Sequence, residues 1–127
     1  MDNGIKILLV DDEQDFANSM AFWLKARGYS AVVEDNCENA LKIIKQDAPD
    51  LVFLDVVMPG VNGLAMLKKI REFNETIPII MMSSFIKESR SEDGSNFYNV
   101  SGIFNKGHDL STALALIKTT LDKKKLT

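Results

Sequence analysis

The sequence lacks the features of a membrane protein or of a secreted, disulfide-linked protein. Its one cysteine, Cys37, has no partner in the chain for a disulfide bond. The longest apolar runs, such as residues 77–82 with Pro78 inside, are far shorter than the ~20 residues that span a bilayer. A signal peptide begins with a basic segment followed by an apolar one, and residues 1–4 do not begin such a pattern. We therefore expect a cytoplasmic protein without a membrane segment.

The chain also lacks an excess of positive charge. Its 15 Lys and Arg residues against 18 Asp and Glu residues give a net charge of −3, and the pI is near 5.1. Binding to a nucleic-acid backbone requires a cationic surface, so direct binding of nucleic acid by this chain is disfavoured. Neither a Gly-x-Gly-x-x-Gly loop nor a Walker A segment follows the first apolar run, which argues against a nucleotide site.

What the chain does have is a globular composition with an alternating pattern. Its 127 residues, of which 46% are hydrophobic and 26% charged, predict a single domain over residues 1–127 with one buried core. Short aliphatic runs predict strands at residues 5–10, 31–33, 51–54, 79–82 and 102–105. Apolar residues at helical spacing lie between and after them, at residues 16–24, 37–44, 64–70 and 110–121.

This alternation predicts a doubly wound α/β fold, in which a five-stranded parallel sheet carries helices on both faces. Asn36 or Asp35 is the candidate N-cap of the second helix. Residues 83–101 are the exception, because they show no apolar stripe and carry a turn signal at Asp93 and Gly94. We expect any helix in this fourth helix region to be short or irregular.

Polar side chains follow four of the predicted strands. They are Asp11 and Asp12 after the first strand, Asp55 after the third, Ser83 after the fourth and Lys106 after the fifth. In a doubly wound sheet, ligands bind beyond the carboxyl ends of the strands. Clustered carboxylates repel one another unless a cation lies among them, and their hard oxygens favour Mg²⁺. A lysine and a hydroxyl beside them predict a site for a phosphoryl group.

The segments that carry these residues resemble the receiver domain of two-component response regulators. They are residues 9–13 (Leu-Val-Asp-Asp-Glu), residues 54–63 and residues 79–83. The resemblance covers essentially the whole chain, and the spacing of the polar residues along it is near that of the family. It implies a flavodoxin-like receiver fold and a place in a two-component phosphorelay.

The resemblance also implies a role for each acidic residue. Asp55 would accept a phosphoryl group from a phosphohistidine on a sensor histidine kinase or a phosphotransfer protein. Asp11, Asp12 and Asp55 would hold Mg²⁺, with Asp12 as a direct ligand. The backbone carbonyl of Val57 would complete the protein ligands of the metal.

Two further residues would read the phosphorylated state. Lys106 would pair with the phosphoryl oxygens, and the Ser83 hydroxyl would bond the new phosphate and move the loop after its strand. Phosphorylation would then switch a partner-binding surface, and an output domain beyond this chain is a possible partner. The chain would catalyse only its own phosphorylation and slow dephosphorylation, so we do not expect an enzyme.

Three features depart from the family pattern. Gly107 stands where the family usually carries a proline with a cis peptide bond, so we expect a looser loop. Ile103 stands where an aromatic side chain commonly swings inward, and Phe104 should face the opposite side of the sheet by strand alternation. Residues 85–100 match the family's fourth helix poorly. These departures keep open a pseudo-receiver, a protein-interaction module that phosphorylation does not regulate.

A Mg²⁺-dependent phosphatase is the remaining alternative. Such an enzyme would need a second acid near the nucleophile, as in Asp-x-Asp, whereas Asp55 is followed by Val56 and Val57. We also expect no redox role for Cys37, because its neighbours are acidic and no basic neighbour lowers the pKa of its thiol. His108, the only histidine, is expected to be an exposed loop residue.

Overall fold

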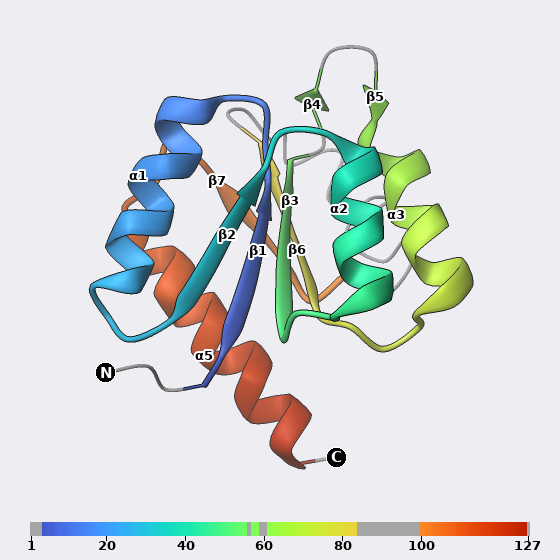
Figure 1. Cartoon of the computed structure of the whole chain (residues 1–127). Helices are drawn as coiled ribbons and strands as arrows, with labels where there is room; N and C mark the ends of the chain where they lie inside the picture. The colour runs from blue at the N-terminus through green and yellow to red at the C-terminus, as the bar shows by residue number, and fades with distance from the viewer. Residues whose placement is uncertain (1–3, 56, 59–60, 84–99, 127) are drawn as a thin grey trace.

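The computed structural model describes residues 4–55, 57–58, 61–83 and 100–126, and its central feature is a five-stranded sheet (Figure 1). The strands are β1 (Lys6–Val10), β2 (Ser30–Glu34), β3 (Leu51–Asp55), β6 (Ile79–Ser83) and β7 (Gly102–Asn105). Their order is β2-β1-β3-β6-β7, and every neighbouring pair is parallel. The strand order reverses between β1 and β3, which is where doubly wound sheets bind ligands. The predicted five-stranded parallel sheet is confirmed.

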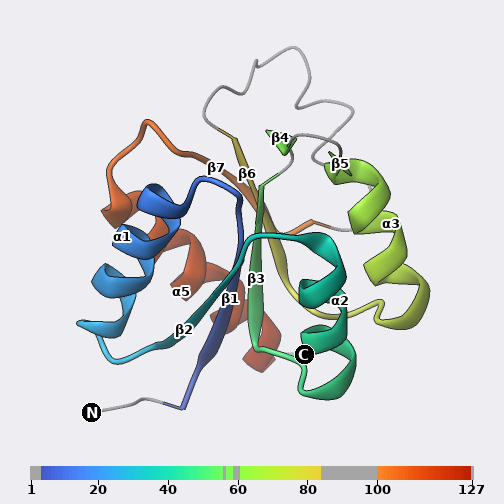
Figure 2. The same ribbon diagram turned by 45° about the horizontal axis from the view of Figure 1, so that its top comes forward.

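Helices cover both faces of the sheet (Figures 1 and 2). On one face lie α1 (Gln14–Lys25) and α5 (Leu110–Leu126), and on the other lie α2 (Cys37–Gln46) and α3 (Gly63–Phe73). All four follow the predicted apolar stripes. The expectation of an irregular fourth helix region falls mainly on residues 84–99, which lie outside the described residues. No helix among the described residues is long and apolar enough to cross a membrane.

The core is divided by the sheet into two layers. The strand side chains that pack with α1 and α5 include Ile7, Leu9, Phe53 and Phe104, and those that pack with α2 and α3 include Leu8, Val10, Val52 and Leu54. Both faces of β1 and β3 are therefore buried, which explains their uninterrupted apolar sequences. Phe104 meets Phe53 edge to face, with ring centroids 6.4 Å apart, whereas Ile103 packs in the other layer. The predicted opposite orientation of Ile103 and Phe104 is confirmed.

Two local features complete the fold. Asn36 is the N-cap of α2, because its Oδ1 accepts a hydrogen bond from Asn39 N at 2.8 Å. A two-stranded antiparallel ladder joins β4 (Val57–Met58) to β5 (Val61–Asn62), where we predicted no strand. Figure 2 shows this hairpin beyond the carboxyl end of β3.

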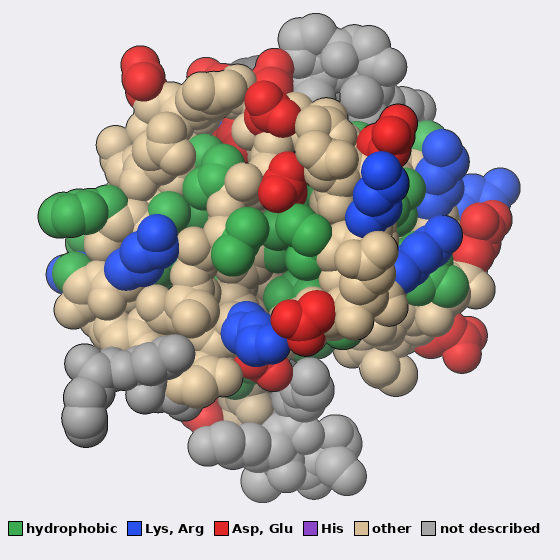
Figure 3. All heavy atoms as spheres, in the orientation of Figure 1, with side chains coloured by type: hydrophobic (Ala, Val, Ile, Leu, Met, Phe, Trp, Pro, Cys, Tyr) green, Lys and Arg blue, Asp and Glu red, His purple; other side chains and the backbone are tan. Residues whose placement is uncertain are grey.

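The described surface carries mixed charge. Figure 3 shows Lys and Arg side chains gathered over α2 and α3, with Asp and Glu side chains among them. One such pair joins Lys42 to Glu38, one helical turn apart, at 3.8 Å. In this view no continuous cationic face forms over the described residues, in agreement with the acidic composition.

Candidate functional site

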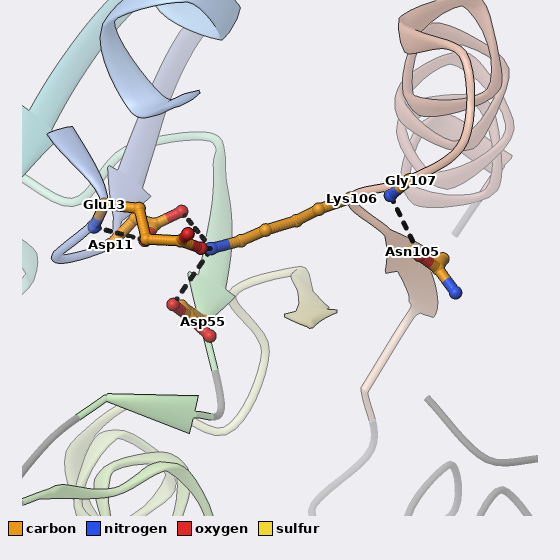
Figure 4. A network of polar contacts seen from close by, with 6 residues as sticks. All are labelled: Asp11, Glu13, Asp55, Asn105, Lys106 and Gly107. Atoms are coloured by element: carbon orange, nitrogen blue, oxygen red, sulfur yellow. Dashed lines mark hydrogen bonds and ion pairs between the residues drawn. The ribbon is translucent and has the colours of Figure 1, made fainter. Parts of the chain in front are cut away.

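The carboxyl ends of the strands bring polar side chains to one edge of the sheet. Asp11 follows β1, Asp55 ends β3, Ser83 ends β6 and Lys106 follows β7. Asp11 is 0% exposed, and Asp55 and Ser83 are each 2% exposed. Buried charges at such positions must be paired to be tolerated. Figure 4 shows how the pairing is made: the Lys106 side chain reaches from the end of β7 across to β1 and β3.

The ammonium group of Lys106 has three carboxylate partners. Its Nζ lies 2.8 Å from Asp11 Oδ2, 3.1 Å from Asp55 Oδ2 and 2.5 Å from Glu13 Oε1. The Phe16 ring, with its centroid 5.0 Å from Nζ, also packs against the ammonium group. Only 5% of the Lys106 side chain is exposed. Lys106 is therefore the buried counter-ion of the acidic cluster.

The electrostatic balance of the cluster follows from burial and charge. Burial raises the pKa of Asp11 above its ordinary value, and the contact with Lys106 opposes this shift. Burial also disfavours the charged form of Lys106, but its contacts with Asp11, Glu13 and Asp55 outweigh burial and raise its pKa. We conclude that Lys106 is protonated at neutral pH.

The same carboxylates have the arrangement of a metal site. Asp11, Asp12 and Asp55 each offer an oxygen, and these oxygens lie within 4.8 Å of one another. The buried Oδ2 of Asp11 meets Lys106 as an ion pair and accepts no hydrogen bond from the residues that the structure describes. Three hard oxygen donors at this spacing, one of them with unused acceptor capacity, fit Mg²⁺. The backbone of Val57 lies in β4, two positions after Asp55.

Ser83 joins this group through the backbone. The Ser83 carbonyl oxygen accepts a hydrogen bond from Lys106 N at 2.8 Å, and Ser83 pairs in register with Asn105 across β6 and β7. The side chain of Ser83 is buried at the same edge of the sheet. The structure thus brings Asp11, Asp55 and Lys106 into direct contact and places Ser83 on the neighbouring strand end.

The loop after Lys106 differs from the sequence expectation. Gly107 N donates to Asn105 Oδ1 at 2.9 Å, and His108 N donates to the Asn105 carbonyl oxygen at 2.9 Å. No cis peptide bond occurs among the described residues, so the bond between Lys106 and Gly107 is trans. Two hydrogen bonds therefore hold the loop that we expected glycine to loosen. The available signal was Asn105, two residues before Gly107, since Asn side chains bond the backbone two residues on.

Glu13 is the functional candidate whose individual role the sequence did not indicate. It appeared there only as the last residue of the segment 9–13, with no assigned task. In the structure its carboxylate is the third anionic partner of Lys106, reached across 93 positions of sequence. No local pattern of residues could indicate this contact.

Comparison with known proteins decides the family. The family described as Response regulator receiver domain matches residues 7–118. The chain belongs to this family. Receiver domains bind Mg²⁺ at an acidic pocket, response regulators are phosphorylated by histidine kinases, and receiver domains are not classical enzymes. The chain thus belongs to two-component signalling, as the resemblance implied.

Curated relatives agree with this assignment over part of their length. The transcriptional regulatory protein BaeR of Escherichia coli is 33% identical over 87 residues, which are 68% of this chain and 36% of BaeR. The regulatory protein VanR of Enterococcus faecium is 38% identical over 78 residues, which are 61% of this chain and 33% of VanR. The matched segments therefore span about a third of the length of these relatives.

Solved structures agree with the fold over nearly the whole chain. A two-component response regulator from Clostridium difficile superposes with a TM-score of 0.85 and 26% identity, covering 94% of this chain and 98% of that one. The response regulator TrrA of Thermotoga maritima, solved in complex with Mg²⁺-BeF, gives a TM-score of 0.80 at 28% identity and covers 91% and 98%. The expected flavodoxin-like receiver fold is confirmed.

Proposed function

We propose that this chain is a phosphoacceptor receiver domain and that Asp55 takes a phosphoryl group from a phosphohistidine on a sensor histidine kinase or a phosphotransfer protein. The observation that carries this proposal is the buried contact of the Lys106 ammonium group with both Asp11 and Asp55. A lone structural ion pair would need one carboxylate, whereas this lysine is shared by carboxylates on two different strand ends.

The roles of the residues follow from charge and position. The Asp55 carboxylate is the nucleophile: its oxygen forms the new bond to phosphorus as the bond from phosphorus to the imidazole nitrogen breaks. Asp11, Asp12, Asp55 and the Val57 carbonyl would hold Mg²⁺, which neutralises charge on the transferred group when bound.

Lys106 and Ser83 complete the proposed chemistry. The buried ammonium group of Lys106 lies 3.1 Å from Asp55, so it can pair with oxygens of a phosphoryl group attached there. The Ser83 hydroxyl would bond another of these oxygens. Because the Ser83 carbonyl oxygen is bonded to Lys106 N, a shift of one residue is transmitted to the other. We propose that this coupling starts the switch in the partner-binding surface.

The setting of the domain is also part of the proposal. Residues 1–127 form one domain, act in the cytoplasm and do not contact nucleic acid directly. Since the matched segments cover only about a third of BaeR and VanR, an output domain outside this chain is the proposed recipient of the switch.

A mass measurement tests the proposal. The chain is incubated with Mg²⁺ and acetyl phosphate, and its intact mass is followed with time. We expect one labile phosphate adduct that is absent from Asp55→Asn and present in Asp122→Asn, which removes an exposed carboxylate on α5. An unmodified wild-type chain, or an adduct that persists in Asp55→Asn, would refute the proposal.

One observation favours the pseudo-receiver as a second candidate. Ile103 packs with the α2 and α3 layer as an aliphatic residue where the family commonly carries a switching aromatic. A chain that takes no phosphate yet still binds a partner would support this candidate. Rapid multiple turnover of acetyl phosphate would instead support a phosphatase.

A further inference from the structure

We infer that Glu13 is a competing ligand of Lys106, which holds the ammonium group in the unphosphorylated protein and is displaced when a phosphoryl group arrives at Asp55. This inference rests on the proposed function. It assigns Glu13 as a positioning residue, because Glu13 would act on the reaction through Lys106.

The contacts around Glu13 form a closed ring (Figure 4). Glu13 N donates to Asp11 Oδ1 at 2.9 Å, Glu13 Oε1 meets Lys106 Nζ, and Lys106 Nζ meets Asp11 Oδ2 at 2.8 Å. Asp11 therefore fixes the Glu13 backbone with one oxygen and contacts the lysine with the other. The Glu13 carboxylate is thereby aimed at Lys106 by the same aspartate that shares the ammonium group.

Helix capping does not explain the position of this side chain. Glu13 is the N-cap residue of α1, and its carbonyl oxygen accepts from Ala17 N at 3.0 Å. Its carboxylate makes no capping hydrogen bond, although a side chain at this position usually accepts one from the first turn. The carboxylate contacts Lys106 instead of the N–H groups in the first turn of its own helix.

Exposure indicates which partner of Lys106 gives way. Asp11 and Asp55 are buried and lie at strand ends, whereas the Glu13 side chain is 58% exposed. Water can therefore solvate Glu13 if it leaves, while the other two carboxylates would remain desolvated. A phosphoryl group on Asp55 needs the charge of Lys106, and Glu13 is the partner displaced at the smallest cost.

The consequence is that Glu13 weakens the binding of the phosphoryl group and keeps the unphosphorylated state favoured. An ion pair with one exposed partner is worth little, so its removal should tighten binding by about two- to fivefold. Because Glu13 is exposed, salt should screen its effect, whereas a change in packing would be insensitive to salt.

Beryllofluoride binding tests this inference. The dissociation constant for beryllofluoride in the presence of Mg²⁺ is measured by calorimetry for the wild type, Glu13→Gln and Asp15→Asn, at low and high salt. Asp15 is the matched control, because it is an exposed acid in the first turn of α1 and forms no ion pair with the residues that the structure describes. We expect tighter binding by about two- to fivefold in Glu13→Gln only, with the gain shrinking at high salt.

Glu13→Asp separates contact from charge. The shorter side chain keeps the negative charge but withdraws it from Lys106, so we expect binding tighter than in the wild type. Equal or weaker binding in Glu13→Gln, or an equal gain in Asp15→Asn, would overturn the inference and leave the proposed function intact. A wild-type chain that neither binds beryllofluoride nor takes phosphate would overturn both.

Discussion

Lys106 is the residue on which the site depends in the absence of a metal. It is the positive charge that the structure places in contact with the buried carboxylates of Asp11 and Asp55. Removing the partner of a buried carboxylate lowers the free energy of unfolding by about 3 kcal/mol or more. The lysine and a metal ion are therefore alternative sources of the same neutralising charge.

Lys106→Met should consequently be destabilised in a metal-dependent way. We expect the free energy of unfolding in urea with EDTA to fall by about 3 kcal/mol, because Asp11 and Asp55 remain buried without a cation. Saturating Mg²⁺ should recover a large part of this loss by occupying the acidic cluster. Lys118→Met, which removes an exposed lysine from α5, is the control and should change little. The same loss with and without Mg²⁺ would contradict this role.

Single residues also show where sequence analysis succeeds. The proximity of Asp11, Asp55 and Lys106 could be predicted from the sequence, because the carboxyl ends of parallel strands lie at one edge of a sheet. The direction of the Glu13 side chain could not be predicted from the sequence. Its carboxylate could equally have capped its own helix or contacted the distant Lys106. For Cys37 the expectation of no basic neighbour was wrong: Lys69 lowers the pKa of the thiol, but burial outweighs it and the net shift is upward.

At the scale of elements, the segment from Asn105 to His108 replaces a rigid proline by a hydrogen-bonded turn. Proline has no backbone N–H, whereas Gly107 uses this group to reach Asn105 Oδ1. A Cβ atom at Gly107 would lie only 3.3 Å from that oxygen, which makes the pairing close-fitting. Lys106 is held between this turn and the hydrogen bond from its own N–H to Ser83.

Asn105→Ala should therefore impair phosphorylation more than its stability cost alone explains. Loss of the hydrogen bond should lower the free energy of unfolding by about 1 kcal/mol, and the looser Lys106 should slow acetyl phosphate labelling severalfold. Asn74→Ala is the matched control, because Asn74 Oδ1 likewise accepts hydrogen bonds from backbone N–H groups, those of Thr76 and Ile77. Asn74, however, precedes β6, whereas Asn105 ends β7 beside Lys106. Equal slowing in both variants would show that only stability matters.

The elements themselves were predictable to different degrees. The four helices and the five strands of the main sheet were predictable from the spacing of their apolar residues. This spacing arises because each of these longer elements buries one or both of its faces. The β4 and β5 hairpin was missed because two residues are too few to show a period. Figure 2 shows β4 beyond the carboxyl end of β3, the strand that ends at Asp55.

At the scale of the whole molecule, the strand order determines where chemistry can occur. The reversal between β1 and β3 leaves Asp11 and Asp55 adjacent at the sheet edge. The end of β7 lies close enough to this edge for Lys106 to contact both carboxylates. The sequence predicted this fold class because β1 and β3 read as buried on both faces. It could not predict the strand order, which depends on pairing between residues far apart in the chain.

Binding of Mg²⁺ should therefore stabilise the entire domain, since the ligands come from different strands and assemble only on folding. At a concentration a hundred times its Kd, Mg²⁺ should add about 2.7 kcal/mol to the free energy of unfolding. For a domain of this size we expect the Tm to rise by roughly 5 to 10 °C in calorimetry.

Asp12→Asn should abolish most of this rise without breaking an ion pair to Lys106, because Lys106 contacts Asp11, Glu13 and Asp55. Asp15→Asn should keep the rise, and NaCl at matched ionic strength should not produce it. A wild-type Tm that Mg²⁺ leaves unchanged would mean that the acidic cluster is filled by Lys106 alone and holds no metal.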